Sequence, residues 1–135
     1  MENLRSKSYI INLKPISWAR AGYNHKSGFY DAQAQEKLCY CIHIQHQHGD
    51  DPLFSKACSL DVIFFMPIPM NAKNKKNPPK YHTFTPDIDN LLKLLLDALR
   101  KNVVTDDKLF CMISAKKLYV HPSETRTEFT ITEVE

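Results

Sequence analysis

Residues 86–101, PDIDNLLKLLLDALRK, carry the clearest structural signal in the sequence. Their apolar residues recur at the spacing of an α-helix, and the charged residues lie on another side. Pro86 stands where a proline commonly opens a helix, so we predict a helix from Pro86 to Arg100 or Lys101. Its apolar stripe consists of Ile88, Leu91, Leu92, Leu95 and Leu99, and its polar side carries Asp89, Lys93 and Arg100.

The remaining elements follow from the segments on either side of this helix. β-Branched and aromatic residues predict strands over residues 7–14, 57–66, 111–120 and 127–134. A second helix is expected from Asp31, as its cap, to about His48, where Gly49 and Pro52 stop it. The order β-α-β-α-β-β predicts an α+β fold in which a small mixed sheet packs with two helices.

Length and composition indicate the class of protein. The 135 residues suit one domain, 1–135, and 43% hydrophobic with 24% charged residues is typical of a globular chain. The net charge of +3 is weakly basic, so the placement of the charges matters more than their sum. No apolar run approaches the roughly 20 residues of a membrane span, and residues 1–7 do not resemble a signal peptide. We therefore expect a cytoplasmic protein.

The cysteines and histidines do not indicate a disulfide framework or a zinc site. The four cysteines form no C-x-x-C pair, and we expect them to be small core or surface residues. His43, His46 and His48 fall in the first predicted helix, but no cysteine or acid completes a tetrahedral set, so a partly exposed helix end is expected. The cysteines are Cys39, Cys41, Cys58 and Cys111.

Residues 71–82, NAKNKKNPPKYH, have a different character, with four lysines, two prolines and no acid. Such a segment cannot bury itself, so we predict a mobile basic loop. Lysines that neutralise phosphates release counterions, so this loop is a candidate for binding a DNA backbone. The alternative is a solvated loop without a partner. The lysines are Lys73, Lys75, Lys76 and Lys80. Arg20, Tyr23 and His25, in the predicted loop over residues 15–28, are further candidates for DNA contact.

Two acids stand at the entrance of the predicted helix. Pro86 favours an extended residue before it, and Asp87 can sit at the cap before the first turn begins. There the carboxylates of Asp87 and Asp89 can converge on one point, beside the partial positive charge of the helix N-terminus. Ionised oxygens of this kind suit Mg²⁺. Lys93, one turn after Asp89, would stabilise the charge on a phosphate under attack.

A third carboxylate would come from the pair Asp106 and Asp107 if the chain doubles back after the helix. Neighbouring side chains of an extended segment face opposite sides, so only one of the two should reach the site. The plain alternative to a metal site is that Asp87 caps the helix while Asp89 forms an ordinary ion pair with Lys93. The residues alone leave both interpretations open.

The combined pattern resembles the RusA family of Holliday junction resolvases. It consists of P-D-x-D-N-x-x-K at residues 86–93, D-A-L at 97–99 and D-D at 106–107. The resemblance implies that Asp87, Asp89 and Asp107 are the active-site acids and hold the metal, and that Lys93 is the catalytic lysine. It also implies a homodimeric enzyme that uses Mg²⁺, or Mn²⁺ in its place, to cut four-way DNA junctions by symmetric nicks.

Two positions depart from the family pattern. Thr85 stands where the family usually has Lys or Arg, which removes one cation near the phosphate. Asn102 stands in the turn where many members have Gly, and Asn is the next best residue for a left-handed helix end. Two other functions remain open: a DNA-binding protein without catalysis, and a Mg²⁺-dependent nuclease that acts on flaps or other branched DNA.

Overall fold

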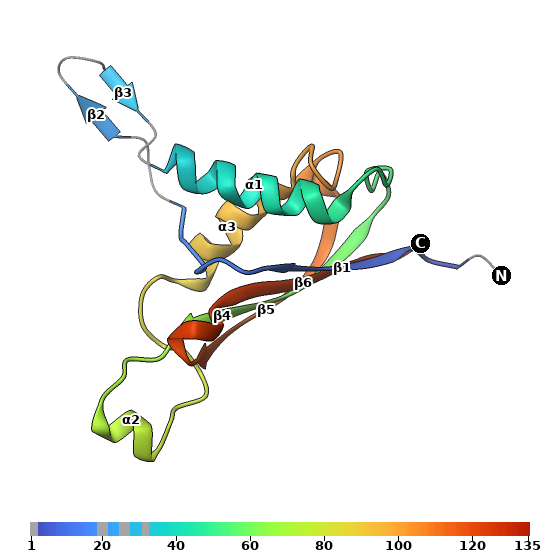
Figure 1. Cartoon of the computed structure of the whole chain (residues 1–135). Helices are drawn as coiled ribbons and strands as arrows, with labels where there is room; N and C mark the ends of the chain where they lie inside the picture. Colours follow the sequence, from blue (N-terminus) through green and yellow to red (C-terminus); the bar gives the residue numbers. More distant parts are fainter. Residues whose placement is uncertain (1–2, 19–21, 25–27, 31–32) are drawn as a thin grey trace.

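The computed structural model describes residues 3–18, 22–24, 28–30 and 33–135 (Figure 1). In chain order the strands and α-helices are β1 Ser6–Ile11, β2 Gly22–Asn24, β3 Gly28–Tyr30, α1 Ala34–His48, β4 Cys58–Pro67, α2 Ala72–Lys76, α3 Ile88–Leu99, β5 Phe110–Val120 and β6 Arg126–Glu133. Two short 3₁₀ helices, η1 Asp107–Leu109 and η2 Pro122–Glu124, precede β5 and β6. Within the described residues, none of the helices has both the length and the apolar character that a bilayer crossing requires.

The main sheet is mixed and has the strand order β1-β6-β4-β5. β6 lies between β1 and β4 and is antiparallel to both, whereas β5 runs parallel to β4. The predicted α+β fold with a small mixed sheet is therefore confirmed. β2 and β3 form a separate hairpin that begins inside the segment 15–28, which we expected to be a plain loop, and extends to Tyr30.

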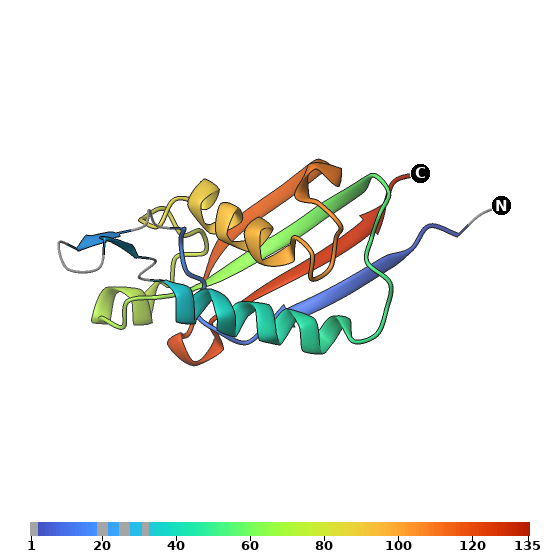
Figure 2. The ribbon, with the colours of Figure 1, turned by 90° about the horizontal axis from the view of Figure 1, so that it is seen from above.

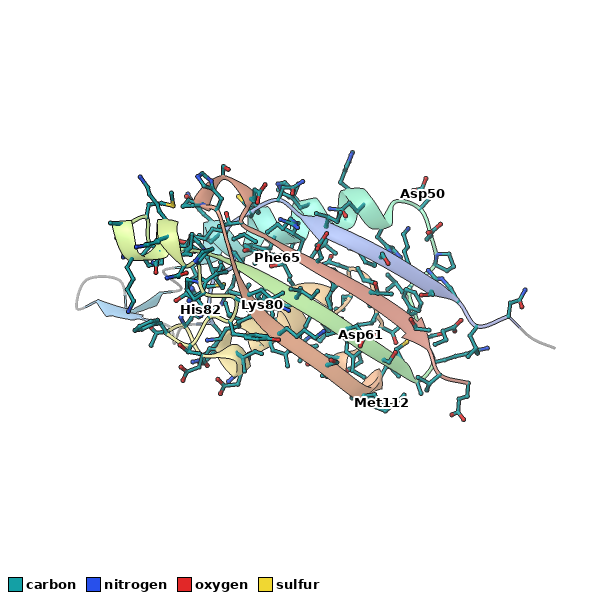
Figure 3. All side chains as sticks on the ribbon, turned by 90° about the horizontal axis from the view of Figure 1, so that it is seen from below. Asp50, Asp61, Phe65, Lys80, His82 and Met112 are labelled. Carbon is teal, nitrogen blue, oxygen red and sulfur yellow. The ribbon has the colours of Figure 1, made fainter. Side chains whose placement is uncertain are left out.

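Helices α1 and α3 lie side by side on one face of the main sheet (Figures 1 and 2). Leu91, Leu95 and Leu99 of the predicted apolar stripe belong to the same buried core as residues of β4 and β6, whereas Ile88 and Leu92 are partly buried at its margin. Burying one leucine side chain contributes roughly 1.5–3 kcal/mol. The opposite face of the sheet carries no α-helix in the described part of the chain, and Asp61 and Phe65 are seen there from below (Figure 3). The buried residues of α3 are Leu91, Leu94, Leu95, Ala98 and Leu99.

Three local details differ from the sequence predictions. The basic segment 71–82 is not all loop, because Asn71 caps the short helix α2 by accepting a hydrogen bond from the Asn74 N–H. The left-handed residue after α3 is Lys101, with φ 66°, while the side chain of Asn102 donates to the carbonyl of Ala98. α1 begins after Gln33, and the predicted cap Asp31 lies outside the described residues. The four cysteines are free thiols, as expected.

Candidate active site

Asp87 occupies the N-cap position of α3, as the sequence predicts. Its backbone is extended, with φ −68° and ψ 148°, and its carbonyl accepts hydrogen bonds from the N–H groups of Asn90 (3.1 Å) and Leu91 (3.2 Å). The Asp87 carboxylate, however, makes no capping hydrogen bond. The backbone therefore starts the helix while the exposed side chain remains free to bind something else.

Asp89 is exposed in the first turn of α3 and has no hydrogen bond or ion pair with any described residue. Lys93 does not pair with it, because the Lys93 Nζ lies over the Trp18 ring, 3.9 Å from the ring centroid. The plain interpretation of these residues required a capping bond and an ion pair, and neither contact is present among the described residues. The two carboxylates thus lie at a helix N-terminus without a partner from the described chain.

The chain that leads into Asp87 is held by β5. The Lys117 Nζ donates to the carbonyls of Phe84 (2.8 Å) and Pro86 (2.9 Å), and the N–H of Trp18 donates to the Asn90 carbonyl (3.0 Å). Lys117 was not predicted from the sequence, because its only local signal is a pair of lysines inside a predicted strand. The entrance of α3 is therefore fixed by residues far from it in the sequence.

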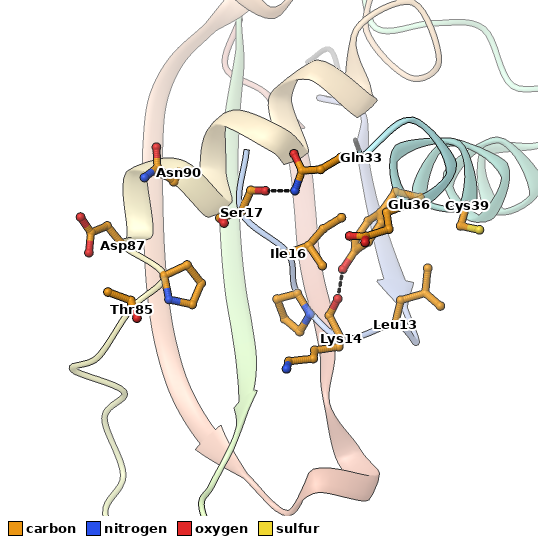
Figure 4. A pocket seen from close by; sticks show the side chains of 13 residues that line it. Leu13, Lys14, Ile16, Ser17, Gln33, Glu36, Cys39, Thr85, Asp87 and Asn90 are labelled. Atoms are coloured by element: carbon orange, nitrogen blue, oxygen red, sulfur yellow. Dashed lines mark hydrogen bonds between the residues drawn. The ribbon is translucent and has the colours of Figure 1, made fainter. Parts of the chain in front are cut away.

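A cavity of about 880 Å³ opens beside Asp87 (Figure 4). It lies between the end of β1, the start of α1 and the start of α3, with Asp87 and Asn90 on one side and Glu36 and Cys39 on the other. The Tyr40 hydroxyl closes one wall by donating to the Lys14 carbonyl. The cavity provides a hollow of mixed polarity next to Asp87.

Asp106 and Asp107 are distinguished by their hydrogen bonds. The Asp106 Oδ1 accepts from the N–H of Lys108 (2.9 Å), so Asp106 caps η1. This backbone hydrogen bond, with a contribution from the neighbouring Asp107 side chain, lowers the pKa of Asp106. Asp107 has no capping role, which makes it the better placed of the two to bind a ligand.

The structure does not bring Asp107 to Asp87 and Asp89 within one chain. Lys117 contacts the carbonyl next to Asp87, whereas Asp107 precedes Phe110 at the other end of β5. Lys117 is the seventh residue after Phe110 along β5, and this stretch of strand spans roughly 23 Å. Accordingly, no three His, Cys, Asp or Glu side chains of the described residues are grouped closely enough to hold a metal ion.

The predicted DNA-binding lysines lie on and after α2, which projects from the end of the sheet away from α1 and α3 (Figure 1). Each of the four is exposed, and the Lys80 Nζ lies 5.3 Å from the Tyr81 ring centroid. Arg20 and His25, together with the side chain of Tyr23, fall outside the described residues. The lysines concerned are Lys73, Lys75, Lys76 and Lys80.

The prediction of a partly exposed histidine-bearing helix end is wrong for His48. Its ring is only 3% exposed, and its Nδ1 forms a 2.7 Å hydrogen bond with the Tyr9 hydroxyl. His46 is exposed and His43 is half-buried. His48 is a structural residue because its partner comes from β1, which the helix sequence alone does not reveal.

Comparison with known proteins adds to this geometry. Residues 12–132 match the model of the family described as Endodeoxyribonuclease RusA. The chain belongs to the RusA family. It is also 30% identical to an uncharacterized protein of Bacillus subtilis (strain 168), YqaN, over 102 residues that cover 70% of each chain. As a RusA family member the chain is an endodeoxyribonuclease of the kind that resolves Holliday junctions.

Proposed function

We propose that this RusA family member is a Mg²⁺-dependent endonuclease that resolves four-way DNA junctions by paired symmetric nicks during recombination and repair. The observation that carries the proposal is the pair Asp87 and Asp89, two exposed carboxylates at the N-terminus of α3 with no partner among the described residues. Solvent-facing acids of this kind add little to the fold, and Asp87 lines a cavity, which suits a functional site.

The donor set at the α3 entrance fits a divalent cation. Carboxylate oxygens are hard donors, which Mg²⁺ prefers and Mn²⁺ also accepts, and free carboxylates need no protein contact to be broken before binding. Asp87 and Asp89 would hold the ion at this entrance, whereas Asp107, the third acid that the resemblance implies as a ligand, lies at the other end of β5 in the same chain. A bound divalent cation would supply charge neutralisation at the scissile phosphate and would lower the pKa of a coordinated water.

The other proposed roles belong to cations of the chain. Lys93, on the same side of α3 as Asp89, neutralises charge that develops on the phosphate, and its stacking on Trp18 holds the side chain in place. Lys73, Lys75, Lys76 and Lys80 bind the DNA backbone through phosphates. We further propose that residues 1–135 act as one domain, that segment 71–82 moves to meet DNA, and that the protein acts in the cytoplasm.

A homodimer suits the proposed substrate. A four-way junction has approximate two-fold symmetry, and its resolution needs two matched nicks. A C₂ dimer presents two copies of one site in related positions, and it is the commonest symmetric assembly. We therefore propose a homodimer as the active form.

The test compares Asp89→Asn with Asp61→Asn, a matched control because Asp61 is also exposed but lies on the sheet face without helices. End-labelled four-way junctions, flaps and linear duplexes are incubated with increasing Mg²⁺. We expect D89N to lower the cutting rate by about 100-fold or more, in the range for loss of a catalytic electrostatic group, and D61N to leave it unchanged. Junction binding without metal should survive in D89N.

The other two functions predict different results. A DNA-binding protein without catalysis would leave every substrate intact at all Mg²⁺ concentrations. A nuclease for other branched DNA would cut flaps faster than four-way junctions. Normal turnover by D89N would remove the proposed role of the α3 entrance altogether.

A further inference from the structure

Two aromatic side chains are exposed on the segment that leads from α2 to α3. Phe84 is 71% exposed and Tyr81 is 62% exposed, and they are the two most exposed of the large hydrophobic residues in the described chain. The Phe84 ring has no ring or cation contact with a described residue, and the Tyr81 ring has one, with the Lys80 Nζ at 5.3 Å. Single exposed hydrophobic residues are common, but two such rings only three positions apart indicate a binding surface.

The backbone that carries these two rings is held in place by β5. The His82 N–H donates to the Lys117 carbonyl (3.1 Å), and the Tyr119 N–H donates to the Lys80 carbonyl (2.9 Å). His82 is only 9% exposed, and its ring centroid lies 5.0 Å from that of Tyr119. The Lys117 Nζ also donates to the Phe84 carbonyl (2.8 Å). The fold therefore fixes the backbone while both rings face solvent, so little ordering entropy is lost when a ligand binds to them.

The charges around the rings fit a polyanion. Residues 71–86 contain four lysines and no acid, and Lys117 adds a further cation at the Phe84 carbonyl. An apolar surface flanked by cations attracts a ligand that combines negative charge with flat apolar groups, and it repels a basic protein partner. A nucleic acid strand has that composition, because its phosphates carry the charge and its bases provide the flat faces.

Stacking on these rings favours unpaired bases over continuous duplex. Inside a duplex each base is stacked between its neighbours, so no flat face is free unless the base is extruded at a cost in free energy. At a branch point, in a flap or in a single strand, bases have lost a neighbour or a pairing partner and their faces are accessible. One base stacked on an aromatic side chain strengthens binding by about 5-fold to 150-fold, whatever its sequence. The rings therefore suit recognition of DNA shape rather than sequence.

The two rings lie close to the α3 entrance along the chain. Phe84 follows Tyr81 by three residues and precedes Asp87 by three, so each of these Cα–Cα distances is at most about 11 Å. That reach corresponds to about three nucleotides of one strand at a rise of roughly 3.4 Å each. A base stacked on Phe84 is therefore within a few nucleotides of a phosphate at Asp87.

We propose that Tyr81 and Phe84 form a stacking platform for unpaired nucleobases, and that this platform makes the protein bind branched DNA more tightly than continuous duplex. The platform holds the unpaired base beside Asp87 and Asp89, whereas the lysines of α2 contact phosphates of either kind of DNA. The inference rests on the proposed nuclease function for the step that follows binding. Stacking itself needs neither metal nor cutting, so it is measured separately.

The first experiment measures binding in metal-free buffer, so that no DNA is cut. Fluorescence anisotropy compares labelled four-way junctions with duplexes of the same arm sequences, for wild-type protein, Tyr81→Leu/Phe84→Leu and Tyr81→Trp/Phe84→Trp. Leucine keeps an apolar side chain without a ring, so the leucine variant should bind the junction about 10-fold or more weakly and the duplex as wild type does. The tryptophan variant should bind the junction at least as tightly as wild type.

Leu4→Ala is the control, because Leu4 is 50% exposed but lies near the start of β4, whereas Lys117 pairs near its end. It should leave both affinities unchanged. Wild-type junction affinity in the leucine variant, or an equal loss for junction and duplex, would overturn the platform, as would wild-type protein without a preference for the junction. If the preference depends on the rings but wild-type protein with Mg²⁺ cuts nothing, the nuclease function fails and the platform stands.

The second experiment locates the stacked base. 5-Iodouracil replaces one thymine at the crossover of the junction, or one in the middle of an arm, and long-wavelength ultraviolet light joins it to an aromatic ring stacked on it. Trypsin cleaves after Lys80 and Lys93, so residues 81–93 form one peptide that carries both rings. We expect mass spectrometry to find the crossover base, but not the arm base, on Tyr81 or Phe84. A crossover base joined only to other residues would overturn the platform.

Discussion

At the start of β1 the charged side chains are paired, whereas at the start of α3 they are not. The Lys7 Nζ lies 2.5 Å from the Asp51 Oδ2 and donates to the His48 carbonyl (2.9 Å), and the Arg5 guanidinium lies 3.9 Å from the Phe54 ring centroid. Asp87 and Asp89 have no such contacts with described residues. We refer to the first group, with Tyr9, as the β1 network, and to the second as the α3 entrance.

This difference separates charges that stabilise the fold from charges that are free to bind a ligand. A half-buried charge with satisfied hydrogen bonds stabilises the folded state, and removing its partner is costly. Two exposed carboxylates without a partner among the described residues contribute nothing comparable, so the fold gives no reason for their arrangement. Variants of the β1 network should therefore lower stability and leave DNA cutting intact. Variants of the α3 entrance or of the α2 lysines should instead weaken DNA cutting or binding and leave stability intact.

The largest expected effect concerns the lysines of α2, which share with the α3 entrance the lack of charged partners among described residues. Changing Lys73, Lys75 and Lys76 together to Gln removes up to three phosphate contacts. The slope of log affinity against log salt should become shallower by up to about 2.7, since each contact contributes roughly 0.9. Fluorescence anisotropy of a labelled junction across a salt series measures this slope.

The matched control for this triple variant uses Lys56 and Lys101, which are exposed but lie near the start of β4, whereas α2 follows the end of that strand. K56Q/K101Q should leave the slope unchanged, and neither variant should alter the melting temperature by more than about a degree or two. A slope that stays at the wild-type value in the triple variant would make α2 a solvated surface rather than a DNA contact.

The second effect concerns the β1 network. Tyr9→Phe removes the hydroxyl that is hydrogen-bonded to the buried Nδ1 of His48, so it leaves a buried polar atom unsatisfied. We expect the free energy of unfolding to fall by about 1–3 kcal/mol, with the junction-cutting rate unchanged under conditions where the protein is folded. Urea unfolding measures the first quantity and a cutting assay at low temperature the second.

Tyr81→Phe provides the control for Tyr9→Phe, because Tyr81 is 62% exposed and its hydroxyl makes no hydrogen bond with a described residue. It should cost less than about 0.5 kcal/mol, as surface substitutions usually do. If Tyr9→Phe lowered cutting without lowering stability, the division between the two regions of charge would be wrong.

Local signals in the sequence were sufficient for α3 and its entrance. The periodic leucines define the buried face, and Pro86 followed by Asp87 places the cap, because both depend on residues within one or two turns. The position of the lysines on an exposed surface followed in the same way from composition. Helix α2 was missed because it depends on one side-chain cap, from Asn71, in a five-residue helix.

Contacts between distant segments were not predictable from the sequence. Asp107 was expected to return to the α3 entrance, but β5 runs parallel to β4 and carries Asp107 to the far end of the sheet. Lys117 reaches the Pro86 carbonyl across 31 positions, and His48 reaches Tyr9 across 39. Spacing within one element gives no information on such pairings, which depend on strand order and register.

The smallest expected effect is a pH dependence of stability that originates in the β1 network. Burial, together with the charge of Lys7, lowers the pKa of His48, and burial with the charge of Lys117 lowers the pKa of His82. Below the ordinary histidine pKa of about 6.5 the unfolded chain binds protons that the folded chain does not, so stability falls as the pH drops and is fully present above that value. One histidine contributes at most about 1.4 kcal/mol per pH unit.

Urea unfolding is measured from about pH 7.5 to about pH 5, on either side of the ordinary histidine pKa of about 6.5. The free energy of unfolding should decline less steeply with falling pH in His48→Gln than in His46→Gln, because His46 is exposed on the same helix. Equal declines in the two variants would mean that His48 takes up its proton as readily in the fold as outside it, and the network would then not exclude charge from its buried ring.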